Sequence, residues 1–158
     1  MSDEQLDDLT QPQRDRLAFV ELRVRFIGDI RRQDLVSRFG IQSAAATRDL
    51  AIYKELAPGN IDYDTKAKCY VLGEDFKPLF DFPPERVLSW LTRGFGDGEP
   101  SQLKAWVASE IPSRLTHPDL DVLACVTRAI HQECPIRVEY HSISSGQTER
   151  QIVPFALI

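Results

Sequence analysis

The chain is poor in the residue types on which much metal, redox and membrane biochemistry depends. Its 158 residues include three cysteines, three histidines and one methionine. The cysteine count is odd, no signal-peptide pattern is visible, and no apolar run is long enough to span a bilayer. We therefore expect a reduced cytoplasmic protein with no membrane role. Internal repeats and low-complexity tracts are also missing, which excludes solenoids and long disordered scaffolds.

The motifs of common enzyme classes are absent as well. There is no Gly-rich phosphate loop, no Gly-x-Ser-x-Gly and no metalloprotease helix. Cys125, His131, Cys134 and His141 are a possible zinc set, but their spacings match no ligand pattern typical of tetrahedral zinc. A catalytic pair of Cys134 and His141 would need both side chains on one side of a short helix-to-strand corner. We expect no enzyme activity, no cofactor and no metal.

Charge is distributed unevenly along the chain. The net charge is -5, which taken alone argues against a nucleic-acid partner. Residues 1–10 form an acidic tail, whereas residues 10–78 hold twelve Lys/Arg against ten Asp/Glu. A mildly basic module behind an acidic tail is compatible with phosphate binding, and it is equally compatible with an ordinary solvated domain.

Residues 11–78 have the pattern of a winged helix-turn-helix domain. A helix is predicted from Pro12 to Phe26, a second from Arg31 to Arg38, and a third from Gln42 or Ser43 to the Pro58-Gly59-Asn60 break. Two short strands, 61–63 and 69–72, then flank a hairpin tip with two lysines. A generic small helical domain with a hairpin is the alternative.

The rest of the chain is predicted to be a helical linker and the start of a second module. Residues 79–117 contain two short predicted helices, 85–92 and 101–109, in which Trp90 and Trp106 are expected to pack rather than to stack on bases. A helix from Pro118 to about Glu133 precedes the strands 136–142 and 147–153, whose alternation predicts a half-buried hairpin. Two strands are marginal alone, so the domain at 118–158 is predicted to be incomplete. The predicted fold class is α+β.

The third helix carries the candidate base contacts. In a helix-turn-helix this helix enters the major groove by its N-terminal end. Arg48 can donate a bidentate pair to guanine, and Thr47 can offer a methyl or hydroxyl to a base edge. Pairing of Arg48 with Asp34, Asp49 or a phosphate remains an alternative. The predicted base contacts are Gln42, Ser43, Ala44, Thr47 and Arg48.

Four basic residues flank that helix in the pattern and are predicted to contact phosphate. They are Arg31 and Arg32 at the start of the second helix, and Lys66 and Lys68 on the hairpin. Ordinary solvated surface charge is the alternative for each of them.

A series of short motifs covers most of residues 13–158. The motifs in the first module are Arg32-Gln33-Asp34-Leu35, Phe39-Gly40-Ile41, Ala46-Thr47-Arg48-Asp49-Leu50, Tyr53, Pro58-Gly59-Asn60-Ile61, Tyr63-Asp64, Lys68-Cys69-Tyr70-Val71 and Phe76-Lys77-Pro78. Those in the second are Ala129-Ile130, Val138-Glu139-Tyr140-His141-Ser142, Gly146 and Glu149-Arg150-Gln151-Ile152-Val153-Pro154-Phe155-Ala156-Leu157. In this order they resemble WYL-domain transcriptional regulators with an N-terminal winged helix, in particular the repressors beside bacterial phage-defence operons.

The resemblance implies a homodimer that binds an inverted repeat in double-stranded DNA. It also implies a Sm/SH3-like WYL β-barrel as a sensor, of which this chain has the first helix and two strands. By position, Tyr140, Ser142 and Arg150 match residues that line the family's presumed pocket for a nucleotide or nucleic-acid ligand. The function so predicted is a ligand-controlled repressor of a phage-defence operon. The alternative is a ligand-sensing or protein-interaction adaptor whose winged helix binds protein.

Overall fold

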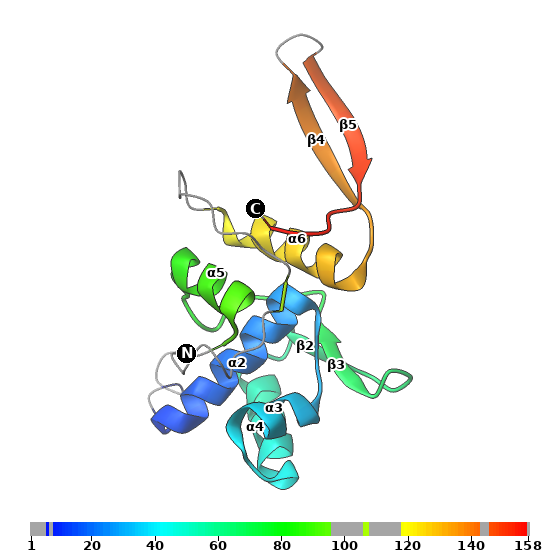
Figure 1. The fold of residues 1–158 in the computed structure, drawn as a ribbon. Coiled ribbons are helices and arrows are strands. Elements are labelled where there is room, and N and C mark those ends of the chain that lie inside the picture. The colour runs from blue at the N-terminus through cyan, green and yellow to red at the C-terminus, as the bar shows by residue number, and fades with distance from the viewer. Residues whose placement is uncertain (1–5, 7, 96–105, 108–117, 143–145, 158) are drawn as a thin grey trace. The chain divides into compact units, whose positions relative to one another are not determined.

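The chain forms two compact units, residues 1–82 and residues 83–158. The computed structural model describes residues 6, 8–95, 106–107, 118–142 and 146–157, without the side chain of Ser142. Along the chain the elements are α2 (Gln11–Ile27), β1 (Asp29–Ile30), α3 (Arg32–Phe39), α4 (Ser43–Leu56), β2 (Ile61–Asp64), β3 (Cys69–Leu72), α5 (Pro84–Arg93), α6 (Leu120–Gln132), β4 (Ile136–Ser142) and β5 (Gly146–Ile152). Helices and strands occur in both units, which confirms the α+β class (Figure 1).

Helices α2 and α3 end where glycine permits a left-handed backbone. The Thr10 amide and hydroxyl both donate to Oε1 of Gln13, at 3.4 and 3.1 Å, and so start α2. Gly28 then stops it with φ of 103°, and Gly40 stops α3 with φ of 63°. The prediction for α2 is confirmed to within a residue at each end, whereas α3 is displaced by one residue.

Helices α2, α3 and α4 enclose the hydrophobic core of the first unit. Phe19 of α2 meets Phe39 at the end of α3 edge to face, with ring centroids 5.5 Å apart. The large apolar side chains of these helices that are fully buried include Leu17, Val20, Leu22, Phe26, Ile27, Leu35, Leu50 and Tyr53. Because this core takes the inner face of α4, the other face of that helix is left for solvent or a partner.

A three-stranded antiparallel sheet completes the first unit, with the order β1-β3-β2. The pairing sets Tyr63 opposite Tyr70, so the predicted hairpin is confirmed as the wing, here defined as residues 61–72. Strand β1 was not predicted, because two residues are too few to show an alternating pattern. It places Ile30 opposite Tyr70 and thereby attaches the wing to the end of α2.

The base of the wing depends on a close approach of two backbone segments. The Gly73 amide donates to the Asn60 carbonyl at 3.0 Å. A Cβ atom at Gly73 would lie 2.1 Å from the carbonyl oxygen of Gly59, which no real side chain tolerates. Glycine is therefore required at 73 for the two ends of the hairpin to meet.

The second unit contains α5, α6 and the β4–β5 hairpin. Trp90 of α5 is buried and lies 4.7 Å from Phe95 between ring centroids, as expected for a packing residue. Trp106 is half-buried, and its amide donates to the Leu91 carbonyl at 2.9 Å. Most of the helix predicted at 101–109 lies outside the described residues. The predicted domain boundaries at 78 and 117 remain a prediction.

The β4–β5 hairpin differs from its predicted burial. Its register pairs Ile136 with Ile152 and Ser142 with Gly146, close to the predicted strand ends. Every residue of β5 is exposed, whereas Ile136 and Val138 of β4 are half-buried, so the prediction of half-buried strands is wrong for β5. Alternation shows which residues share a face, but burial also needs an element to cover that face.

Candidate nucleic-acid interface

The two faces of α4 differ in the way a recognition helix requires. Ala46 and Tyr53 are buried against the other helices of the first unit. Gln42, Ser43, Ala44, Thr47 and Arg48 are all exposed, as predicted for base contacts. Short side chains occupy the front of this face, so the backbone amides of the first turn can approach an anion or a base edge closely.

Arg48 and its neighbour Asp49 show how the structure separates the two faces. Asp49 is buried and receives Arg16 of α2 in a two-point pair, with Nε 2.6 Å and Nη2 3.2 Å from the carboxylate oxygens. Asp34, the other carboxylate considered for Arg48, lies 3.3 Å from Arg23 Nε. Both carboxylates thus form ion pairs with other arginines. Within the described residues, the exposed Arg48 has no ion pair with either carboxylate.

Thr47 has its hydroxyl occupied within the helix. Its Oγ1 donates to the Ser43 carbonyl at 3.0 Å, which is common for a threonine inside a helix. The hydroxyl is therefore less available to a base, and the methyl is the group that remains for an apolar contact with thymine. Gln42 is at the helix N-cap without a side-chain capping bond, so its amide also remains available to a partner.

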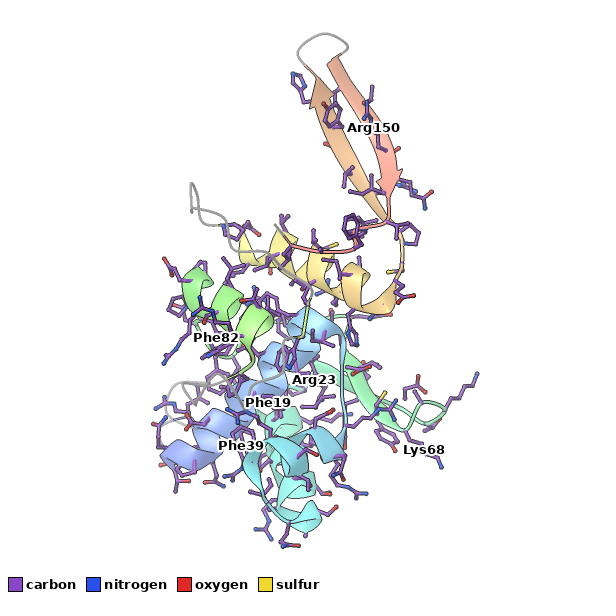
Figure 2. All side chains as sticks on the ribbon, in the orientation of Figure 1. Phe19, Arg23, Phe39, Lys68, Phe82 and Arg150 are labelled. Atoms are coloured by element: carbon purple, nitrogen blue, oxygen red, sulfur yellow. The ribbon has the colours of Figure 1, made fainter. Side chains whose placement is uncertain are left out.

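The tip of the wing is a turn organised by Asp64. Oδ1 of Asp64 accepts the amides of Lys66 and Ala67, at 2.8 and 3.0 Å. Lys68 follows with a left-handed φ of 54° and extends from the tip (Figure 2). The two lysines are exposed, as the sequence predicts for a wing.

The two arginines at the start of α3 have different surroundings. Both are exposed. Arg31 donates from Nη1 to the Ala67 carbonyl at 2.9 Å, so its guanidinium already contacts the wing tip. Arg32, the first residue of α3, makes no hydrogen bond or ion pair to the described residues.

Sequence reasoning missed a buried polar network beneath the wing. Glu21 of α2 accepts the Tyr53 hydroxyl at 3.0 Å and the Leu79 and Phe80 amides at 2.8 and 3.0 Å. Asn60 donates to the Tyr53 oxygen at 3.0 Å and exchanges two bonds with the Lys77 backbone. A charged residue within an apolar helix face was the available signal, but its partners are distant in sequence.

Burial sets the ionisation of this network. It raises the pKa of Glu21, against the opposing effects of the Phe80 and Leu79 amides, the Tyr53 hydroxyl and the Arg25 charge. Burial and the adjacent Glu21 also raise the pKa of Tyr53, which keeps the phenol protonated and able to donate. The network attaches residues 77–80 to α2 and α4, and so holds the chain that leaves the wing.

The predicted ligand residues lie on the β4–β5 hairpin, and the register brings two of them together. The guanidinium of Arg150 lies over the Tyr140 ring, 4.2 Å from its centroid. Figure 2 shows Arg150 on this hairpin, and Tyr140 is 45% exposed. The Ser142 side chain lies outside the described residues. An aromatic ring with a cation on its face can bind a base or a phosphate.

The remaining chemistry is sparse. All three cysteines are free, and burial, ahead of nearby charges, raises the pKa of the Cys69 thiol, which disfavours a reactive thiolate. Among the described side chains no three His, Cys, Asp or Glu residues converge on a possible metal position. No helix in the described part combines the length and apolar character needed to cross a bilayer.

A family model and several known proteins match this chain, and both matches include the winged helix-turn-helix domain. Residues 12–93 match the family model described as the BrxR transcriptional regulator winged helix-turn-helix domain. Relatives named "DNA-binding transcriptional repressor CapW" are 32% identical over 149 residues in Pseudomonas aeruginosa, 30% over 150 in Stenotrophomonas maltophilia and 30% over 154 in Escherichia coli. Each alignment covers 90% of this chain and 50% of the relative. The chain thus spans about half the length of the curated relatives it matches.

Proposed function

Since the chain belongs to the BrxR family of winged helix-turn-helix transcriptional regulators, we propose that it binds double-stranded DNA sequence-specifically and acts as a repressor. The observation that carries the proposal is the exposed face of α4. This face combines an available arginine with short side chains at the helix start, while both nearby carboxylates are held by other arginines. The relatives named as DNA-binding transcriptional repressors also support DNA binding and repression.

In this proposal α4 lies in the major groove and reads bases. Arg48 donates to the O6 and N7 atoms of guanine, and Thr47 places its methyl against thymine. Ser43 and Ala44 allow the helix start to approach, and Gln42 offers its amide to an adenine or a phosphate. These five residues are the proposed base contacts.

The phosphate contacts are proposed on both sides of that helix. Arg32 at the start of α3 and Lys66 and Lys68 on the wing are exposed cations whose side chains have no ion-pair partner among the described residues. Arg31 retains guanidinium donors beyond the one given to Ala67. Four such contacts would make the observed binding constant fall with salt at a log–log slope of about -3.6.

The wider assembly follows from the resemblance and not from the described residues. We propose that the protein acts as a homodimer on an inverted repeat, because a two-fold dimer places two recognition helices on two half-sites. The regulated genes would be a phage-defence operon, and the site of action is the cytoplasm, where bacterial DNA lies. A nucleotide or nucleic-acid ligand at Tyr140, Ser142 and Arg150 would control DNA binding. No catalytic step is part of the proposal.

A fluorescence anisotropy titration tests DNA binding directly. The chain is titrated against duplex DNA from upstream of its own gene and against a scrambled duplex, each at two salt concentrations. We expect tighter binding to the upstream duplex, with an affinity that falls steeply as salt rises. Equal, weak binding to both duplexes at low salt would contradict the proposal. It would favour the adaptor function, in which the winged helix binds protein.

A further inference from the structure

The side chain of Arg31 connects the start of α3 to the wing tip. Its Nη1 donates to the Ala67 carbonyl at 2.9 Å, across 36 positions of sequence. Ala67 stands between Lys66 and Lys68, the two lysines proposed to contact phosphate. The bond therefore fixes the one backbone carbonyl that both lysines flank.

The backbone of Arg31 is itself fixed by a hydrogen bond to Asp34. Its amide donates to Oδ2 of Asp34 at 2.7 Å, and the same carboxylate oxygen lies 3.3 Å from Arg23 Nε. Arg23 also lies 3.7 Å from Asp29, whose backbone pairs with Val71 of the wing. A chain of charge-assisted contacts thus runs from α2 through α3 to the wing tip, and Arg31 is its last member.

Few other contacts restrain the wing tip. The Asp64 turn closes the tip on itself but does not join it to the helices. Residues 65–68 are exposed, and among the described residues the Arg31 bond is the hydrogen bond that joins them to another element. Without it the two lysines would still be present, but their distance from α3 and α4 would vary.

We infer that Arg31 is a positioning residue for the wing, an inference that rests on the proposed DNA binding. Besides the phosphate contact of its remaining guanidinium donors, its main contribution is to preorganise Lys66 and Lys68 for phosphate. Ordering the tip before binding reduces the conformational entropy that binding must otherwise remove. The assignment also accounts for the difference between Arg31 and the adjacent Arg32, which makes no such bond.

A double-mutant cycle separates positioning from simple charge. Arg31→Ala and Arg32→Ala are each made in the wild-type chain and in a Lys66→Ala/Lys68→Ala chain, and DNA affinity is measured by anisotropy. The two single variants remove the same charge from adjacent exposed positions, so Arg32→Ala is the matched control. Thermal melting confirms that all variants are folded.

The cycle gives opposite results for the two roles. If Arg31 positions the wing, Arg31→Ala weakens DNA binding by about tenfold in the wild-type chain. In the Lys66→Ala/Lys68→Ala chain, Arg31→Ala weakens DNA binding only by about as much as Arg32→Ala does. Equal losses for Arg31→Ala in both backgrounds would overturn the inference. Arg32→Ala should lose the same factor in both.

A measurement without DNA keeps this inference separate from the proposed function. Amide hydrogen exchange at Lys66 and Ala67 should accelerate by about tenfold in Arg31→Ala and stay unchanged in Arg32→Ala. Unchanged exchange in Arg31→Ala would overturn the inference even where DNA binding is established. If the wild-type chain binds no DNA, the proposed function fails, whereas faster exchange would still show that Arg31 holds the tip.

Discussion

The wing and the β4–β5 hairpin, the two antiparallel hairpins in the described part of the protein, differ in what supports them. The wing has a third strand on one edge, buried residues Ile61 and Cys69, and an arginine bonded to its tip. The β4–β5 hairpin has longer strands and a complete register, yet all of β5 is exposed. Pairing of two strands therefore does not by itself create a buried sheet; the third strand and the covering helices do.

The largest expected difference is in the cost of truncating one isoleucine in each hairpin. Ile61 of β2 is fully buried, whereas Ile152 of β5 is 44% exposed. We expect Ile61→Ala to lower the free energy of unfolding by about 2–5 kcal/mol, and Ile152→Ala to change it by less than about 0.5 kcal/mol. Urea unfolding of the full chain, followed by circular dichroism, measures both. Equal costs would show that the two hairpins are equally supported.

The buried network at the base of the wing gives the next effect, which depends on pH. Glutamine at position 21 would turn an NH2 group toward N–H or O–H donors, so Glu21→Gln should cost about 1–3 kcal/mol of stability. The raised pKa means that the native state holds the Glu21 proton more tightly than the unfolded chain does. The stabilisation it confers is therefore complete below the ordinary value of 4.5 and falls as pH rises through the raised value.

The stability deficit of Glu21→Gln should consequently be largest below pH 4.5 and should shrink as pH rises above it. Urea unfolding of both proteins at a series of pH values gives the difference directly, and the shared titrations of other groups cancel. A deficit that grows with pH would mean that the folded pKa is lowered, with the acceptor bonds outweighing burial.

A third prediction tests whether Arg48 of α4 reads a DNA base, with an exposed arginine of the β4–β5 hairpin as the control. Arg48→Ala should reduce the preference for specific over scrambled DNA by about 1–3 kcal/mol if Arg48 reads a base. The side chain of Arg137 of β4 is 79% exposed and pairs with Glu149. Arg137→Ala is therefore a control that removes the same charge from the β4–β5 hairpin, away from α4. Anisotropy with the two duplexes measures the ratio. An unchanged ratio in Arg48→Ala would remove that residue from base readout and leave it a phosphate contact at most.

The smallest expected effect concerns the contact of Arg150 with the Tyr140 ring. An exposed cation–π pair contributes about 0.5–1 kcal/mol, so Arg150→Met and Tyr140→Leu should be coupled by no more than this in a double-mutant cycle. Amide exchange along β4 and β5 reports the local opening free energy. No coupling would show that the pair, although 4.2 Å apart, does not stabilise the hairpin.

Local signals explain the parts of the fold that were predictable. The capping pair at Thr10 and the glycines at 28 and 40 act through neighbouring residues, so the ends of α2 and the order of the winged helix follow from the sequence. Strand β1 was not predictable because its two residues are defined by their pairing with β3, forty positions away. The exposure of β5 was equally beyond a periodicity argument, because alternation does not supply a covering element.

For the candidate site, the sequence by itself determined which residue types lie on the outer face of α4 and at the wing tip. Helical and hairpin periodicity are enough to place Thr47, Arg48, Lys66 and Lys68 outward. Only the tertiary structure decided which charges remain available. It pairs Asp49 with Arg16, bonds Arg31 to the Ala67 carbonyl and buries Glu21 with its carboxylate on the Leu79 and Phe80 amides. These partners are between 33 and 59 residues apart, and such contacts form through three-dimensional packing that no local pattern encodes.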